Sequence, residues 1–308
     1  MPPVVTASGL SKSFGKHSVL DGLSLEINAG EVYGLVGLNG AGKTTLIRLL
    51  LGVLKADSGA LSVLGGDPWS HDASLCRRMG VVLEHDGFWG NLDFRQNMKI
   101  FAAARGVAWN DALRYLEEFW GGTEIYASRK AVKYFSRGMR MQCALCRAFL
   151  GWPSVYFFDE PAVALDVSAY DHFAALVRRV RSDGAAVCIS SHQLDAIDDL
   201  AVRAGMLRGG ALTELSRGTG AQWSIGADRN AAWADIIADV CGSAPVWSSG
   251  EWRFAVKDAP AAVPVLIKRL VEAGCSISKA MPVRNEFSQA IRNEYRSQAE
   301  APEREAAS

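Results

Sequence analysis

Residues 37–44 have the types and the spacing needed to hold a chain of phosphates. The stretch follows the pattern G-x-x-x-x-G-K-[ST], with Gly37, Asn39, Gly40, Ala41, Gly42, Lys43 and Thr44 among its members. Glycines let backbone amides fold tightly around phosphate oxygens, so Gly37, Gly40 and Gly42 are predicted to shape the cradle. Lys43 supplies a positive charge for the β- and γ-phosphates, and the Thr44 hydroxyl is a ligand for Mg²⁺. The stretch therefore predicts that the chain binds a nucleoside triphosphate.

The flanking segments place this stretch between a strand and a helix. The apolar run at 31–36 is typical of a short buried strand. A helix is predicted from Thr45, with an apolar face formed by Leu46, Ile47, Leu49, Leu50 and Leu54. The N-terminus of that helix adds the positive end of its dipole to the cradle. A strand, a loop and a helix in this order are the context that the motif requires.

Two further strands are predicted to end on carboxylates. The apolar run that begins at Val155 continues into Asp159 and Glu160, and the strand predicted at 80–83 is followed by Glu84. Buried strands rarely end in paired charges for packing reasons, so we expect Asp159 to support magnesium and Glu160 to act as a general base. Site residues gather at strand ends in α/β sheets, which places Glu84 at the same edge.

A histidine, a helix start and an aromatic residue are further candidates. His192 ends the apolar strand predicted at 185–192. A single histidine there is usually a solvated loop residue, but this is the fourth strand to bring a polar group to one edge. Ser136 and Gly138 form either a helix cap or a phosphate site at a helix N-terminus. Phe14 is either a half-buried strand aromatic or a platform on which adenine stacks.

The composition excludes several classes of function. In the 308-residue chain, 33 Lys and Arg residues balance 33 Asp and Glu residues. A chain without net charge has no global field that would draw it onto nucleic acid, so no nucleic acid partner is expected. No apolar run approaches the roughly 18 residues of a membrane span. The N-terminal residues lack the pattern of a signal peptide. We therefore expect a cytoplasmic chain whose membrane role comes through a partner.

The cysteines give no sign of a disulfide framework. Six are spread along the chain, and reduced thiols are the default in the cytoplasm. Cys143 and Cys146 form a C-x-x-C pattern inside a helical stretch, without a second pair or a neighbouring histidine. We therefore expect these two residues to serve packing, and not a zinc or redox function.

A change in composition after residue 212 predicts a second domain. The expected organisation is a nucleotide-binding domain at 1–212, with a helical subdomain at about 85–150, and an accessory domain at 213–298. The accessory stretch alternates as β-α-β-β-α-β with an added helix near 284–296, which predicts a small α+β, ferredoxin-like domain. It carries no phosphate loop, so a regulatory or interaction role is expected. The acidic, alanine-rich tail at 299–308 is predicted to be disordered.

With these motifs in this order, the chain resembles the nucleotide-binding subunit of an ATP-binding cassette (ABC) transporter over about residues 4–215. Residues 37–44 look like the Walker A motif, and residues 155–160 look like Walker B with its catalytic glutamate. Asp166 lies in a stretch similar to the D-loop, and His192 matches the switch histidine. Phe14 matches the aromatic on which adenine stacks, and this favours the second of its two interpretations.

The resemblance implies a fold, an activity and a set of partners. The fold would be α/β, a P-loop NTPase of ABC type with a mixed β subdomain, a RecA-like parallel sheet and a helical subdomain. The activity would be ATP hydrolysis with Mg²⁺. The partners would be a second nucleotide-binding subunit, with two ATP molecules sandwiched between the two, and a separate transmembrane permease. The chain would lie at the inner face of the membrane and push on the permease through the aromatic-rich region from Phe88 to Phe101.

The resemblance also assigns roles to individual residues. Lys43, Glu160 and His192 would be catalytic, and Thr44, Glu84 and Asp159 would hold the metal ion. The nucleotide would further contact Phe14, Gly37, Asn39, Gly40, Ala41, Gly42, Thr45, Ser136, Gly138 and Asp166. Ser136 and Gly138 would reach the γ-phosphate of the ATP held by the opposite subunit.

The sequence departs from the family's motifs at two places. The signature Leu-Ser-Gly-Gly-Gln stands as Phe135-Ser136-Arg137-Gly138-Met139, so Arg137 adds a charge near the expected interface. Glu84 stands where the family has a glutamine. A carboxylate can still ligate Mg²⁺, directly or through water, and its charge is expected to make magnesium coupling sensitive to pH. Glutamate here is similar to lantibiotic-immunity and some drug-exporter ATPases, which suggests an exporter of a drug, peptide or lipid-like compound.

Two other classes of function compete with this one. A soluble ABC ATPase acting on nucleic acid or in translation usually fuses two cassettes or inserts a coiled coil, and this chain has one cassette and no heptad stretch. A degenerate cassette would bind ATP for assembly only. Glu160 and His192 argue against that class, whereas Arg137 and Glu84 keep it open.

Overall fold

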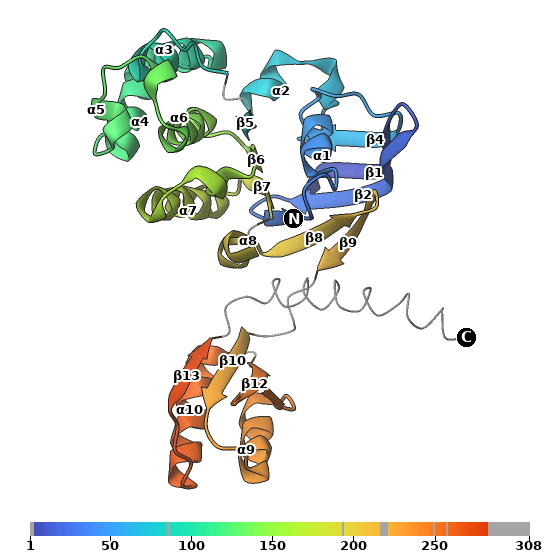
Figure 1. The fold of residues 1–308 in the computed structure, drawn as a ribbon, viewed down its shortest axis with the longest axis vertical. Coiled ribbons are helices and arrows are strands. Elements are labelled where there is room, and N and C mark those ends of the chain that lie inside the picture. Colours follow the sequence, from blue (N-terminus) through green and yellow to red (C-terminus); the bar gives the residue numbers. More distant parts are fainter. Residues whose placement is uncertain are drawn as a thin grey trace. The chain divides into compact units, whose positions relative to one another are not determined.

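The chain divides into two compact units, Met1–Glu214 and Leu215–Ser308. The computed structural model describes residues 3–84, 87–192, 194–215, 221–248, 250–256 and 258–282 (Figure 1). The helix predicted near 284–296 and the disordered tail predicted at 299–308 lie outside these residues.

A three-stranded antiparallel sheet begins the first unit. Its order is β2-β1-β4, with the bounds β1 (Pro3–Phe14), β2 (His17–Asn28) and β4 (Ser58–Val63). In β2 the apolar residues Leu23, Leu25 and Ile27 are buried, and the residues between them are exposed. This period of two gives the sheet one face for the core and one face for solvent.

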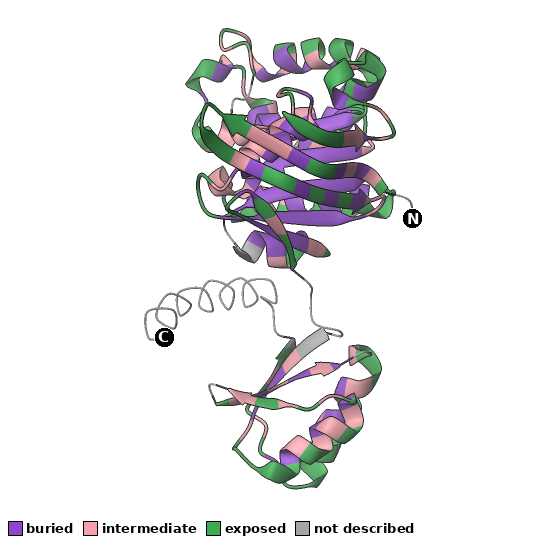
Figure 2. Ribbon diagram, turned by 90° about the vertical axis from the view of Figure 1, so that its right-hand side faces the viewer, coloured by how far each residue is buried: buried purple, intermediate pink, exposed green. Residues whose placement is uncertain are grey.

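A six-stranded sheet forms the centre of the first unit. Its order is β5-β6-β7-β3-β8-β9, with the bounds β3 (Val32–Val36), β5 (Met79–Val82), β6 (Val155–Asp159), β7 (Ala186–Ser191), β8 (Arg203–Arg208) and β9 (Ala211–Leu215). Every pair from β5 to β8 is parallel. Strands β3, β6 and β7 are buried along their whole length (Figure 2). Because these strands are parallel neighbours, the residues that follow them meet at one edge of the sheet.

Helices pack on the central sheet and fix the segments that follow its strands. The helix α1 (Lys43–Leu50) joins residues of both sheets in one buried cluster through Leu46, Ile47, Leu49 and Leu50. The helices α7 (Val167–Ser182) and α8 (Leu194–Leu200) pack against β7, and α8 also packs against β3. The short helix α2 (Ala73–Arg77) precedes β5, and the 3₁₀ turns η1 (Pro68–Ser70), η2 (Val132–Tyr134) and η3 (Pro161–Ala164) lie in the loops.

A helical subdomain lies between β5 and β6 in the sequence. It contains α3 (Phe94–Arg105), α4 (Trp109–Trp120), α5 (Glu124–Ala127) and α6 (Arg137–Phe149). Asp93 and Gln96 form a capping box at the start of α3, and the Ser136 hydroxyl accepts a hydrogen bond from the Met139 amide at the start of α6. The cap defines where α6 begins, and so places Arg137 as its first residue.

The two cysteines of the C-x-x-C pattern lie on the buried face of α6. Cys143 and Cys146 are both completely buried, and burial raises the pKa of the Cys146 thiol well above its usual range.

In the described part of the chain, no helix is both long and apolar enough to cross a membrane.

The second unit follows the order β-α-β-β-α-β. Its elements are β10 (Ala221–Gly226), α9 (Ala231–Cys241), β11 (Val246–Ser248), β12 (Glu251–Val256), α10 (Ala259–Glu272) and β13 (Lys279–Pro282). The strands pair antiparallel in the order β11-β12-β10-β13. Ile225, Trp252 and Phe254 of the sheet share a core with Trp233 and Leu266 of the two helices.

Candidate functional site

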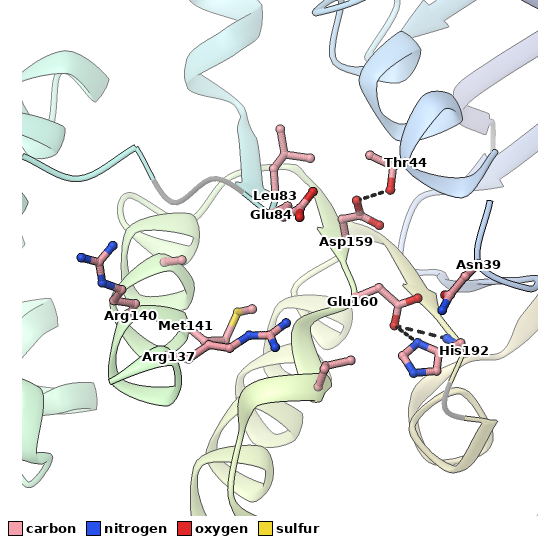
Figure 3. A pocket seen from close by; sticks show the side chains of 12 residues that line it. Asn39, Thr44, Leu83, Glu84, Arg137, Arg140, Met141, Asp159, Glu160 and His192 are labelled. Atoms are coloured by element: carbon pink, nitrogen blue, oxygen red, sulfur yellow. Dashed lines mark hydrogen bonds and ion pairs between the residues drawn. The ribbon is translucent and has the colours of Figure 1, made fainter. Parts of the chain in front are cut away.

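A cavity of about 520 Å³ opens at the carboxyl edge of the central sheet (Figure 3). It brings together six residues that the sequence predicts for the site: Asn39, Thr44, Glu84, Asp159, Glu160 and His192. They follow or end strands β3, β5, β6 and β7, which are neighbours in the sheet. Residues of the helical subdomain, including Arg137, Arg140 and Met141 of α6, complete the lining.

The glycines of the phosphate cradle act in two different ways. Gly40 and Gly42 have φ angles of 82° and 105°, a left-handed conformation that favours glycine. Gly37 does not adopt this left-handed conformation. It allows close packing instead, because a Cβ at this position would lie 2.7 Å from the carbonyl oxygen of Leu207. Gly42 is the N-cap of α1 and offers no side chain to the first-turn amides. Those amides are therefore available to an anion.

Lys43 is buried, and its ammonium group contacts three oxygen atoms. Its side chain is 6% exposed, and Nζ donates hydrogen bonds to the carbonyl oxygens of Gly37 at 2.7 Å and Leu38 at 3.3 Å. Nζ also lies 3.3 Å from Oε1 of Glu160. The ammonium thus connects the end of the cradle to the acidic end of β6.

Thr44 and Asp159 provide oxygen ligands suited to magnesium. The Thr44 hydroxyl donates to Oδ2 of Asp159 at 2.6 Å, and Glu84 lines the same cavity. Hydroxyl and carboxylate oxygens suit Mg²⁺, which protein sites usually bind through one or two carboxylates together with substrate phosphates. No cluster of three or more His, Cys, Asp or Glu side chains able to hold a metal occurs among the residues that the structure describes. The Thr44 hydroxyl and the Asp159 and Glu84 carboxylates fit a magnesium ion that would also bind phosphate oxygens.

Glu160 stands between a lysine and a histidine. Its Oε2 lies 2.8 Å from Nδ1 of His192 and also accepts a hydrogen bond from the His192 amide at 3.2 Å. The backbone of Glu160 is left-handed, with φ 52° and ψ 47°, which costs a non-glycine residue about 1 kcal/mol. The carboxylate is thus held from both sides in the lining of the cavity. A residue held in this way is suited to orienting or deprotonating a water molecule.

Ser190 is a site residue that the sequence analysis missed. Its hydroxyl donates to Oδ1 of Asp159 at 2.5 Å and accepts a hydrogen bond from the Glu160 amide at 3.1 Å. One buried hydroxyl therefore positions both acidic residues. The signal was a pair of serines at the end of an apolar strand, because a buried polar side chain needs a partner. In the same strand, burial and the nearby Asp159 carboxylate raise the pKa of the Cys188 thiol to about 12, so this thiol stays protonated.

Replacing Ser190 by alanine should lower ATP turnover about tenfold to a hundredfold, the usual cost of losing a group that orients ligand residues. ATP affinity should change much less, because the cradle does not involve Ser190. Phosphate release and ATP titration measure the two effects. Ser182→Ala is the matched control, since the Ser182 hydroxyl is exposed and donates to the carbonyl oxygen of Arg179. If Ser190→Ala hydrolysed ATP as fast as the control, Ser190 would have no role in turnover.

Ten of the predicted site residues are absent from the lining of this cavity. Six of them belong to the adjoining stretch 37–45, namely Gly37, Gly40, Ala41, Gly42, Lys43 and Thr45. The other four lie elsewhere in the chain. Phe14 ends β1 and is 51% exposed, with the Lys12 ammonium 5.7 Å from its ring centre. Ser136 is exposed as the N-cap of α6, and Gly138 is the second residue of that helix. Asp166 caps α7 through the Ala169 amide and lines a different cavity. Their roles toward a nucleotide remain predictions.

The chain is similar to a known protein family and to named bacterial proteins. A family model described as ABC transporter matches residues 20–163. The chain is 32% identical over 215 residues to the bacitracin transport ATP-binding protein BcrA of Bacillus licheniformis, covering 70% of each chain. It is 30% identical to the lantibiotic transport ATP-binding protein SrtF of Streptococcus pyogenes, covering 66% of this chain and 86% of that protein. The daunorubicin/doxorubicin resistance ATP-binding protein DrrA of Streptomyces peucetius is 31% identical over 70% of this chain and 65% of its own length.

Solved structures share the fold of the first unit. An ATP-binding subunit of an ABC transporter superposes with a TM-score of 0.65 at 24% identity, covering 69% of this chain and 90% of that one. A dimeric ATP-binding cassette with bound ADP and phosphate superposes with a TM-score of 0.60 at 22% identity, covering 70% of this chain and 99% of that one. Both similarities concern the fold alone.

Proposed function

The chain belongs to the ABC transporter family as an ATP-binding subunit, and we propose that it hydrolyses ATP in the cavity described above and drives a membrane transporter. The observation that carries this proposal is the meeting of Lys43, Asp159 and Glu160 at one edge of the sheet. Cation, metal ligand and general base are the groups that phosphoryl transfer to water requires.

The contacts of Lys43 suggest how the site is activated. In this structure the ammonium is balanced by Glu160 and by two backbone carbonyls. Phosphate oxygens compete for the same ammonium, and this would free Oε1 of Glu160 to accept a proton from the attacking water. His192 keeps hold of Oε2 and so maintains the direction of the carboxylate. When bound, Mg²⁺ neutralises phosphate charge, and Thr44, Asp159 and Glu84 would hold it.

We propose that two such subunits face each other across their nucleotides. Ser136 is exposed at the N-terminus of α6, where its hydroxyl and the helix dipole favour an anion. Asp166 lies beside Val167, which is 80% exposed, in a separate cavity of about 600 Å³. Exposed apolar and capping groups of this kind suit contact with a second subunit. A solved dimeric cassette with bound ADP and phosphate has the same fold as the first unit.

A groove of about 470 Å³ provides the proposed contact with a permease at the inner face of the membrane. It lies between α2, β5, α3 and α6, and Phe101, Arg77, Arg105 and Arg147 are among its lining residues. Three arginines and an aromatic ring suit a permease segment that carries acidic and apolar side chains. In the aromatic-rich region from Phe88 to Phe101, Trp89 is 49% exposed, whereas Phe94 is completely buried and serves the core.

Leu83 lines both this groove and the nucleotide cavity. The segment after β5 therefore connects the two sites directly. The names of the relatives BcrA, SrtF and DrrA support a transporter that exports a drug, peptide or lipid-like compound.

Filling the groove should abolish binding to the permease. Ala104→Trp places an indole in the groove, whereas Ala103→Trp changes the preceding exposed residue of α3, which does not line it. Affinity purification from detergent-solubilised membranes of the native host should recover a multispanning protein with the wild-type chain and with Ala103→Trp, but not with Ala104→Trp. ATP hydrolysis by the purified variants is the control for folding. Recovery of ribosomes or nucleic acid in place of a membrane protein would contradict the proposal.

A further inference from the structure

Arg147 of α6 lines the groove proposed for the permease, and its side chain is held by its own chain. Its guanidinium carbon lies 5.3 Å from the ring centre of Phe88 and 5.1 Å from that of Phe101. Through Nη2 it also donates a hydrogen bond of 3.2 Å to the carbonyl oxygen of Val81 in β5. A planar guanidinium stacks on aromatic rings with its face and donates hydrogen bonds at its edge. Arg147 therefore connects the two rings to β5.

The two rings also contact each other and a third ring. Phe88 and Phe101 meet edge to face with their centres 5.5 Å apart, and the Trp89 ring lies 5.6 Å from that of Phe101. Phe101 lines the groove, and Trp89 is 49% exposed. A permease segment in the groove would thus contact Phe101, whose ring lies beside the Arg147 guanidinium.

Beside Arg147, the backbones of α6 and β5 approach each other closely. A Cβ at Gly80 would lie 2.7 Å from the carbonyl oxygen of Ala148, so this approach requires glycine. The hydrogen bond from Arg147 to Val81 adds a second link at the adjacent residue of each element. Densely packed protein interiors transmit a displacement instead of absorbing it. We therefore expect α6 and the end of β5 to move together.

Both elements continue into the nucleotide cavity. On α6, Ala144 lies almost one helical turn before Arg147 and lines that cavity, whereas Arg147 lines the groove. After β5, the chain continues through Leu83 and Glu84, which line the nucleotide cavity. A displacement of the Arg147 guanidinium would therefore reach two sides of the ATP site.

We propose that Arg147 is a positioning residue that couples the binding of the permease to the hydrolysis of ATP. A permease segment that contacts Phe101 would shift the guanidinium beside its ring, and with it α6 and the end of β5. Because the guanidinium is engaged by its own chain, Arg147 acts on the ATP site without touching the nucleotide. This role rests on the proposed function, since it requires both the permease and the hydrolysis of ATP.

A titration of the chain with its membrane partner tests this role. The multispanning protein that co-purifies with the wild-type chain is separated from it, placed in nanodiscs and added in increasing amounts to each variant, with phosphate release from Mg·ATP as the measurement. Arg147→Met still covers the two rings but cannot donate to Val81. At saturation, its change in hydrolysis rate should be about twofold to thirtyfold smaller than that of the wild-type chain, the range found for residues that carry coupling between sites. The half-saturating concentration should change less, whereas Ala104→Trp should raise it.

Three further variants make the test specific. Arg147→Lys should recover part of the lost response, because an ammonium can still donate to Val81 and lie over a ring. Phe88→Leu removes one ring and leaves the hydrogen bond, so its response at saturation should also fall, although Phe88 does not line the groove. Arg129→Met changes an exposed arginine outside the groove and the nucleotide cavity, and is the control for the loss of one positive charge. Without the membrane protein, all variants should hydrolyse ATP at the rate of this control.

Other outcomes contradict this role in distinct ways. If Arg147→Met responds at saturation as the control does, or if the membrane protein leaves the wild-type rate unaltered, Arg147 couples nothing. If Arg147→Met instead raises the half-saturating concentration, the residue serves docking. A loss of hydrolysis already without the membrane protein, in both Arg147→Met and Phe88→Leu, would show that these side chains only maintain the fold. If no membrane protein co-purifies with the wild-type chain, the proposed function itself fails.

Discussion

Replacement of Glu160 by glutamine is expected to lower ATP turnover by about 10²–10⁴-fold, the usual contribution of a general base, while ATP binding is retained. The amide keeps the size of the side chain and can still contact His192 through its oxygen. It cannot take a proton from water. The cradle of Gly40, Gly42 and Lys43 is unaltered, so the nucleotide should still bind. Phosphate release and an ATP titration on the same preparation separate the two effects.

The control for this variant is Glu118→Gln. Glu118 is an exposed residue whose carboxylate lies 3.7 Å from Arg179, and it is absent from the cavity lining. The control should hydrolyse ATP at the wild-type rate. If Glu160→Gln also hydrolysed ATP at near the wild-type rate, Glu160 would not be the base.

Replacement of Lys43 by methionine should weaken ATP binding by at least about a hundredfold, as expected for the loss of a buried, preorganised cation. Methionine fills a similar volume but leaves the Gly37 carbonyl and Oε1 of Glu160 without their cation. Turnover should be lost together with binding, unlike in Glu160→Gln. Calorimetric titration with ATP measures the loss.

Lys55→Met is the matched control, because Lys55 lies over the ring of Trp69 and not in the nucleotide cavity. Unaltered ATP affinity in Lys43→Met would show that the backbone amides of the cradle hold the phosphates without the lysine. The role assigned to Lys43 would then be wrong.

The parts of the site that the sequence predicts are those carried by strand ends. Asp159, Glu160 and His192 follow buried apolar runs, and parallel strands bring such ends to one edge, so their meeting follows from the pattern. The same logic applies to Glu84, although its strand β5 ends at Val82, one residue earlier than predicted. The family resemblance then supplied the reaction, which the comparisons with known proteins support.

Other features of the site could not be predicted from the sequence. They depend on the directions of side chains and on contacts between segments that are far apart in the chain. The role of Gly37 depends on the Leu207 carbonyl, 170 positions away in the chain. Ser190 contacts both Asp159 and Glu160 because β6 and β7 are neighbours and their register places Asp159 opposite Ser190. Arg137 has a long side chain at a helix start, and only the folded cap shows which cavity it enters. The left-handed backbone of Glu160 has no sequence signal, because the residue is not glycine.

The most direct test of this account is the release of phosphate from Mg·ATP by the purified wild-type chain, alone and with the membrane protein that co-purifies with it. The account predicts steady phosphate release that stops when EDTA removes magnesium and that is absent in Glu160→Gln. A wild-type chain that binds ATP but releases no phosphate under either condition would contradict it, and would show a cassette that uses ATP for assembly only.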